Sequence, residues 1–157
     1  MELNRDPQQM LRELLAEEGQ EVPLSRLLHR YGLDFEPAHR PDRIPEGVKK
    51  YCFRNSLRLA TENPSLKYVE GVVIPATVER SAQRHAWCVN RGGRVIDSTP
   101  TWADPGRPLP NAMIGIALPL ELARPHVECE KPTRGALSAL SDRLEVVTDA
   151  LGLKRID

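Results

Sequence analysis

Aromatic residues are scarce in this chain of 157 residues: two Trp, three Tyr and two Phe make up 4% of it, so aliphatic side chains must fill most of the core. Net charge is also lacking, because 22 Lys and Arg balance 22 Asp and Glu. A neutral protein has no overall field to attract nucleic acid or an anionic membrane, and we expect neither partner.

No segment approaches 18 consecutive apolar residues, and the start shows no signal-peptide pattern. We therefore expect a cytoplasmic protein without membrane spans.

Cysteines are too few and too widely spaced for a disulfide framework. There are three, Cys52, Cys88 and Cys129, so at least one thiol should be free. We interpret Cys88 and Cys129 as structural residues. A zinc site made by His85 and Cys88 is disfavoured, because residues three apart on a strand point to opposite faces. We expect no metal and no cofactor.

Length and composition limit the fold class. The chain fits a single domain, 1–157. Fourteen Pro and ten Gly exclude an uninterrupted helical bundle. Helical patterns come first and strands joined by hairpins follow, which predicts an α+β fold with an antiparallel sheet. We divide the domain into an N-terminal helical extension at 1–32, a catalytic-type core at 47–122 and a C-terminal helix at 140–152.

Local signals mark where the elements begin and end. Asp6 and Pro7 form a helix start, and Gly19 should end that helix. A second helix should end at Gly32, and the proline-rich segment 34–46 should be a loop. The remaining expected elements are a helix at 51–62, a strand at 66–78, a hairpin at 85–99, a strand at 113–120 that ends at Pro119 or lies at a sheet edge, and a helix at about 141–151.

The most informative residue is Cys52, in the first turn of the expected helix at 51–62. Unpaired N–H groups and the helix dipole favour a thiolate at that position. A nucleophilic thiolate needs a base, and that base needs an orienting group. If Asn90-Arg91-Gly92 form a three-residue loop with a left-handed glycine, His85 directly faces Asp97 across the hairpin. These residues predict a Cys-His-Asp triad.

At this point the sequence resembles a known family. Cys52 opens a Cys-x-x-Asn helix start, HAW occupies 85–87 and GRVIDST occupies 93–99. This order is similar to transglutaminase-like proteins within the papain-like cysteine enzymes, and to small uncharacterised bacterial and viral proteins. The resemblance covers 52–102. It implies a fold in which the cysteine helix packs against an antiparallel sheet that carries His and Asp. It also implies that Cys52 is the nucleophile, His85 the base and Asp97 the orienting residue.

Four further residues are candidates for the site. Asn55, one helical turn after the cysteine, and the backbone N–H of Cys52 are candidate oxyanion donors. Tyr51 is a candidate to line the site. Trp87 shares a strand face with the histidine and is either a cleft wall or a core anchor, while Trp102 is a candidate for the cleft rim. Substrate specificity should reside in the loops.

These observations favour a cysteine-dependent acyl-transfer enzyme, of the amidase, peptidase, deamidase or transglutaminase kind. Its substrate would be a peptide, a protein or a small amide. The alternative is a catalytically inert papain-like domain that binds or inhibits a protein partner. Nothing in the residues chooses an oligomeric state.

Overall fold

An antiparallel sheet of five strands forms the centre of the molecule. The computed structural model describes residues 5–76, 81–100, 102–128 and 135–153, so Cys129 lies outside the described residues. The strands are β1 (Leu33–Phe35), β2 (Lys67–Ile74), β3 (Gln83–Val89), β4 (Val95–Ile96) and β5 (Ala112–Leu118), and their order in the sheet is β1-β5-β2-β3-β4. Every strand pair is antiparallel, which confirms the expected α+β class with an antiparallel sheet.

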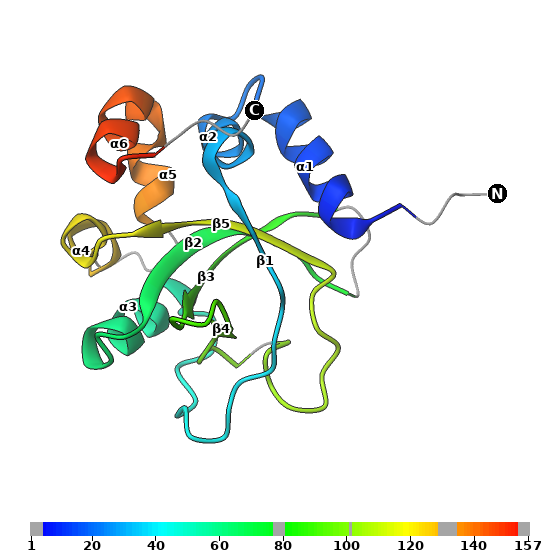
Figure 1. The fold of residues 1–157 in the computed structure, drawn as a ribbon, viewed down its shortest axis with the longest axis vertical. Helices are drawn as coiled ribbons and strands as arrows, with labels where there is room; N and C mark the ends of the chain where they lie inside the picture. Colours follow the sequence, from blue (N-terminus) through cyan, green and yellow to red (C-terminus); the bar gives the residue numbers. More distant parts are fainter. Residues whose placement is uncertain (1–4, 77–80, 101, 129–134, 154–157) are drawn as a thin grey trace.

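Helices cover one face of this sheet (Figure 1). They are α1 (Pro7–Glu18), α2 (Pro23–Tyr31), α3 (Cys52–Glu62), α4 (Leu120–Val127), α5 (Ala136–Leu140), the 3-10 turn η1 (Ser141–Arg143) and α6 (Leu144–Leu151). No helix in the described ranges is long and apolar enough to cross a membrane.

The predicted ends of the first two helices are confirmed. The Asp6 side chain accepts a hydrogen bond of 3.2 Å from the backbone N–H of Gln8, and Pro7 occupies the first helical position of α1. Gly19 ends α1 and Gly32 ends α2, as expected. The buried leucines of both helices belong to the main core, so these helices pack against the sheet face that carries the other helices; they are Leu11, Leu15, Leu24, Leu27 and Leu28.

The two faces of the sheet bury different sets of side chains, because neighbouring residues on a strand point in opposite directions. The helix-covered face carries most of the aliphatic core, including Ala86 and Cys88 of β3. A smaller cluster lies on the opposite face, and its buried members are Val69, Val73, Trp87, Val89, Val95 and Met113.

Two loops cover that second cluster, and we call them the covering loops, residues 36–51 and 102–111. They lie on the side of the sheet away from α1, α2, α5 and α6 (Figure 1). The loops bind each other: the Arg40 backbone N–H donates to the Ala103 carbonyl at 2.6 Å, and the Arg40 guanidinium lies 2.7 Å from the Asp104 carboxylate. Phe35 and Trp102 pack onto the cluster from the loop side.

Several elements differ from the sequence-based expectations. The strand at 113–120 does end before Pro119, but β5 lies inside the sheet, between β1 and β2, and not at its edge. The expected loop at 34–46 begins with the last residues of β1. Helices α4 and α5 were not expected, since Pro125 lies inside α4 and α5 spans only five residues. The C-terminal helix begins with a 3-10 turn and ends, as predicted, at Gly152, whose φ is 59°.

Gly115 on β5 allows the Trp87 ring to approach the backbone of the sheet closely. A Cβ added there would meet Trp87 side-chain carbons at 2.8 and 2.9 Å and a Val69 methyl at 2.7 Å. We predict that Gly115→Ala destabilises the protein by about 1–3 kcal/mol through overpacking, as measured by urea unfolding. Gly92→Ala is the matched control, because its nearest contact would be at 3.4 Å. Equal stability of the two variants would contradict the close packing of Trp87.

Candidate active site

The N-terminus of α3 carries Cys52, which is a half-buried free thiol. Tyr51 precedes it as the N-cap residue and makes no side-chain capping bond. The first N–H groups of a helix have no partner within the helix, and the helix dipole is positive at this end. The prediction that Cys52 lies in the first turn of a helix is confirmed.

The β3–β4 hairpin has a different register from the predicted one. Val89 pairs with Val95, so the loop is Arg91-Gly92-Gly93, one residue later than expected. Gly93, with φ of 82°, takes the left-handed position that we had assigned to Gly92. The Asn90 side chain stabilises the observed register, because it accepts a hydrogen bond of 2.9 Å from the backbone N–H of Arg94.

The changed hairpin register alters how His85 and Asp97 face each other, but the two side chains still make contact. His85 and Asp97 are not directly opposite; they are diagonal neighbours on the same face, within reach for a long side chain. The His85 Nε2 atom lies 2.5 Å from the Asp97 Oδ2 atom. The other carboxylate oxygen, Oδ1, accepts a hydrogen bond of 2.9 Å from the Thr99 backbone N–H. Both oxygens of Asp97 are therefore occupied, and the imidazole is fixed in orientation.

Cys52 completes this arrangement from the helix side. Its side chain lies near enough to His85 to contribute to the raised pKa of that imidazole, and because Nε2 faces Asp97, the ring nitrogen available for Cys52 is Nδ1. Burial alone would lower the pKa of His85, which is only 3% exposed. The neighbouring Asp97 carboxylate and the contact with Cys52 outweigh burial and raise that pKa to about 10. The structure thus brings the three predicted triad residues together.

Asn55 makes contacts that differ from the expected ones. Its Oδ1 atom accepts from the Val48 backbone N–H at 3.0 Å, and its Nδ2 atom donates to the Val48 carbonyl at 2.7 Å and to the Thr99 hydroxyl at 2.9 Å. Both amide hydrogens are used, so the expectation that Asn55 donates to an oxyanion is wrong for this conformation. Asn55 instead links the segment before Cys52 to the segment after Asp97.

Tyr51 lies on the solvent side of the site, with 37% of its surface exposed. The guanidinium carbon of Arg54 lies 5.9 Å from the centroid of its ring. Tyr51 precedes Cys52 directly in the chain and is partly open to solvent.

The two tryptophans have different roles. Trp87 is fully buried, stacks on the His85 ring at 6.2 Å between centroids, and meets Phe35 edge-on at 5.4 Å. It is a core anchor, and its expected alternative role as a cleft wall is wrong. Trp102 is half-buried, and its ring centroid lies 4.8 Å from that of His85. Trp102 therefore covers the imidazole from the loop side, where a cleft rim was expected.

Cys88 is a structural residue, as predicted. It is fully buried on the helix-covered face, its thiol donates to the Ser56 carbonyl at 3.2 Å, and burial raises its pKa to about 12. His85 points to the opposite face, so the two residues do not converge on a metal. Within the described ranges, no group of three His, Cys, Asp or Glu side chains is placed to hold a metal ion.

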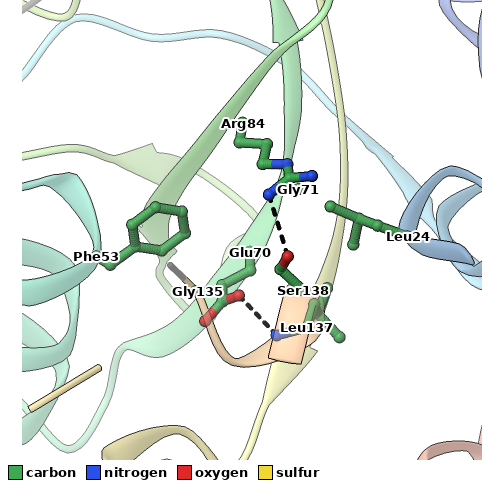
Figure 2. Close-up of a pocket in the computed structure, with 8 residues that line it drawn as sticks. All are labelled: Leu24, Phe53, Glu70, Gly71, Arg84, Gly135, Leu137 and Ser138. Carbon is green, nitrogen blue, oxygen red and sulfur yellow. Dashed lines mark hydrogen bonds between the residues drawn. The ribbon is translucent and has the colours of Figure 1, made fainter. Parts of the chain in front are cut away.

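A second buried carboxylate, Glu70, was not predicted. Its oxygens accept hydrogen bonds from the Tyr68 hydroxyl at 2.5 Å and from the backbone N–H groups of Ala136 and Leu137 at 2.8 and 2.9 Å. Figure 2 shows the carboxylate directed at the first turn of α5, beside Phe53. Burial raises the pKa of Glu70 despite these donors. The sequence signal for it was a lone glutamate within the apolar strand β2.

The raised pKa of His85 predicts a specific pH dependence of stability. The group should stabilise the fold fully below about pH 6.5, the ordinary His value, and progressively less as the pH rises toward about 10. Urea unfolding of the wild type and of His85→Gln isolates this effect, because the other buried titratable groups occur in both proteins. The difference in free energy of unfolding should shrink as the pH rises. A constant or growing difference would contradict the raised pKa.

The contact between the covering loops should keep Trp102 against His85. Both side chains of the Arg40–Asp104 pair are largely buried, at 14% and 18% exposure. We predict that Asp104→Asn loosens the loop and increases acrylamide quenching of tryptophan fluorescence, since Trp87 is inaccessible to the quencher. Asp34→Asn is the matched control, because it removes an ion pair with Arg12 on the opposite side of the sheet. Identical quenching of wild type and Asp104→Asn would show that the pair does not position Trp102.

Comparisons with protein-family models, with curated proteins and with solved structures found no match to this chain. The function is therefore inferred from the geometry of Cys52, His85 and Asp97.

Proposed function

We propose that this protein is a cysteine-dependent acyl-transfer enzyme with Cys52 as nucleophile, His85 as proton carrier and Asp97 as orienting residue. The observation that carries the proposal is the His85 ring, which bonds Asp97 through Nε2 and lies near Cys52, whose side chain helps to raise its pKa. We also propose that the helix and sheet that carry these residues form a papain-like or transglutaminase-like core, as the sequence resemblance implies. A fixed imidazole between a thiol and a carboxylate is the arrangement that nucleophilic catalysis requires.

The reaction follows from the placement of each group. The Cys52 sulfur attacks the carbonyl carbon of an amide or thioester, and a carbon–sulfur bond forms. His85 donates its Nδ1 proton to the leaving amine or thiol as the bond to that group breaks, and Asp97 stabilises the imidazolium before the transfer. Water or an amine then attacks the acyl-enzyme, His85 takes the proton of the attacking group, and the Cys52 thiolate is released.

The backbone N–H of Cys52 is the oxyanion donor that this geometry supports. It belongs to the first turn of α3, where N–H groups lack partners within the helix, and it lies beside the attacking sulfur. The amide of Asn55 supports it indirectly, because its bonds to Val48 and Thr99 fix the segment from which α3 begins. Asn55 is therefore a positioning residue in this mechanism.

The burial of His85 favours a second candidate, an inert domain that binds a protein partner. The imidazole is 3% exposed and Trp102 lies against it, so the triad residues also serve as packing. The two candidates differ in the reactivity of Cys52, which only an enzyme requires.

The pH dependence of Cys52 alkylation by iodoacetamide separates the two candidates. In the wild type, the protonated imidazole should stabilise the thiolate, and the rate should stay near its plateau down to about pH 6. In His85→Ala the rate should instead follow a free thiol, which titrates near pH 8.5. The rate is read from mass spectrometry of the peptide that contains Cys52.

His29→Ala is the matched control, since His29 is exposed on α2 and should leave the profile unchanged. An ordinary thiol profile in the wild type, unaffected by His85→Ala, would overturn the enzyme proposal and leave the binding domain.

A further inference from the structure

Lys50, two residues before Cys52, has a backbone conformation that lysine rarely adopts. Its φ is 71°, and it is the one residue other than glycine with positive φ in the part of the chain that the structure describes. Glycine adopts this left-handed conformation without steric cost, whereas a side chain with a Cβ is strained. Strained residues cluster at functional sites, where the surrounding structure maintains them.

The surroundings of Lys50 do fix its conformation. The Val48 N–H and carbonyl are both bonded to Asn55 on α3, and the Tyr51 N–H donates to the Val48 carbonyl at 3.2 Å. These bonds close a tight turn immediately before α3. Lys49 and Lys50 lie in this turn with both side chains exposed to solvent.

The turn places two positively charged residues close to Cys52 along the chain. Consecutive Cα atoms are about 3.8 Å apart, so the Cα of Lys50 lies within about 7.6 Å of that of Cys52, and the Cα of Lys49 within about 11.4 Å. These separations are comparable with the Debye length of about 10 Å at 0.1 M salt. Neither lysine forms an ion pair with any residue that the structure describes. The negative charge of Asp97 is matched by the imidazole that it contacts.

We propose that Lys50, together with Lys49, selects acyl donors that carry a negative charge close to the reacting carbonyl, such as a carboxylate-bearing amide or thioester. This inference rests on the proposed acyl-transfer function and names its substrate class. A thiolate repels an anionic substrate, and the ammonium groups of the two lysines in the turn before Cys52 oppose that repulsion. The net charge of the whole chain is zero, so no overall field of the molecule opposes an approaching anion.

The strain at Lys50 is part of this inference. Glycine would fit the turn better, so a lysine at this position sacrifices stability for its charge. Substitution by glycine should therefore have opposite effects on stability and on anion preference. If Lys50 had no functional role, its substitution by glycine would raise stability and leave the anion preference unchanged.

The test compares two alkylating reagents of similar size, anionic iodoacetate and neutral iodoacetamide. We define a normalised ratio as the rate with iodoacetate over the rate with iodoacetamide at Cys52, divided by the same ratio for the neutral thiol 2-mercaptoethanol. The division removes the intrinsic difference in reactivity between the two reagents. At low ionic strength this normalised ratio should exceed one in the wild type. It should fall roughly threefold in Lys50→Gln and approach one in 1 M NaCl.

Lys50→Gly should lower the normalised ratio to the same extent and raise the urea midpoint of unfolding. Lys67→Gln is the matched control, because Lys67 is equally exposed at the start of β2 and should leave both quantities unchanged. A lower urea midpoint in Lys50→Gly would contradict the strain argument.

A normalised ratio near one in the wild type, unaltered by Lys50→Gln, would overturn the anionic substrate class. The acyl-transfer proposal would survive that result as long as the iodoacetamide profile depends on His85. If that profile does not depend on His85, the acyl-transfer proposal fails and the substrate class fails with it.

Discussion

The alternation of side chains along β3 is the constraint on which the rest of the structure depends. Ala86 and Cys88 point into the aliphatic core beneath the helices, while His85 and Trp87 point to the face that the covering loops close. The polar pair of His85 and Asp97 is therefore buried without interrupting the main core. β4 pairs with β3 only at Cys88 and Val89. At His85, the edge of β3 that faces away from β2 therefore has no pairing with β4. Cys52 packs against the helix-side core and still reaches the imidazole, so the N-terminus of α3 joins the two sides.

The two buried carboxylates, Glu70 and Asp97, have hydrogen-bond partners of different charge. An uncompensated buried charge is costly. The hydrogen-bond partners of Glu70 are a hydroxyl and two backbone N–H groups, all neutral, and burial raises its pKa. It joins β2 to the first turn of α5. Asp97 has instead a partner of raised pKa, His85, which carries the compensating positive charge. A charge-compensated pair can hold and release a proton beside a thiol, whereas Glu70 is suited to connecting two elements.

The sequence predicted the features that depend on local chemistry. Capping by Asp6, the ends of α1 and α2 at glycines and the start of α3 at Cys52 all follow from short-range rules. The contact between His85 and Asp97 was predicted for partly wrong reasons, because the wrong glycine was placed in the left-handed position. Moving the loop by one residue changes the partner of each strand residue by two positions, so both side chains stay on the predicted face of the sheet. Contacts between distant segments were not predictable. The bonds of Asn55 to Val48 and Thr99, and the complete burial of Trp87, depend on how the covering loops fold back, which no local pattern specifies.

The enclosure of His85 restricts the order in which an acyl-transfer reaction can occur. Trp102 and Trp87 lie against the imidazole, and Asp97 occupies Nε2, so a proton enters or leaves through Nδ1, beside Cys52. In the described structure, the same nitrogen, Nδ1, must donate a proton to the leaving group and accept a proton from the acyl acceptor. The leaving group must depart with its proton before the acceptor can deliver its own, which requires a covalent acyl-enzyme between the two steps. Under the proposed function, the turn of Lys49 and Lys50, which precedes Cys52 in the chain, would select the acyl donor by charge, and the acyl-enzyme could pass its acyl group to either water or an amine.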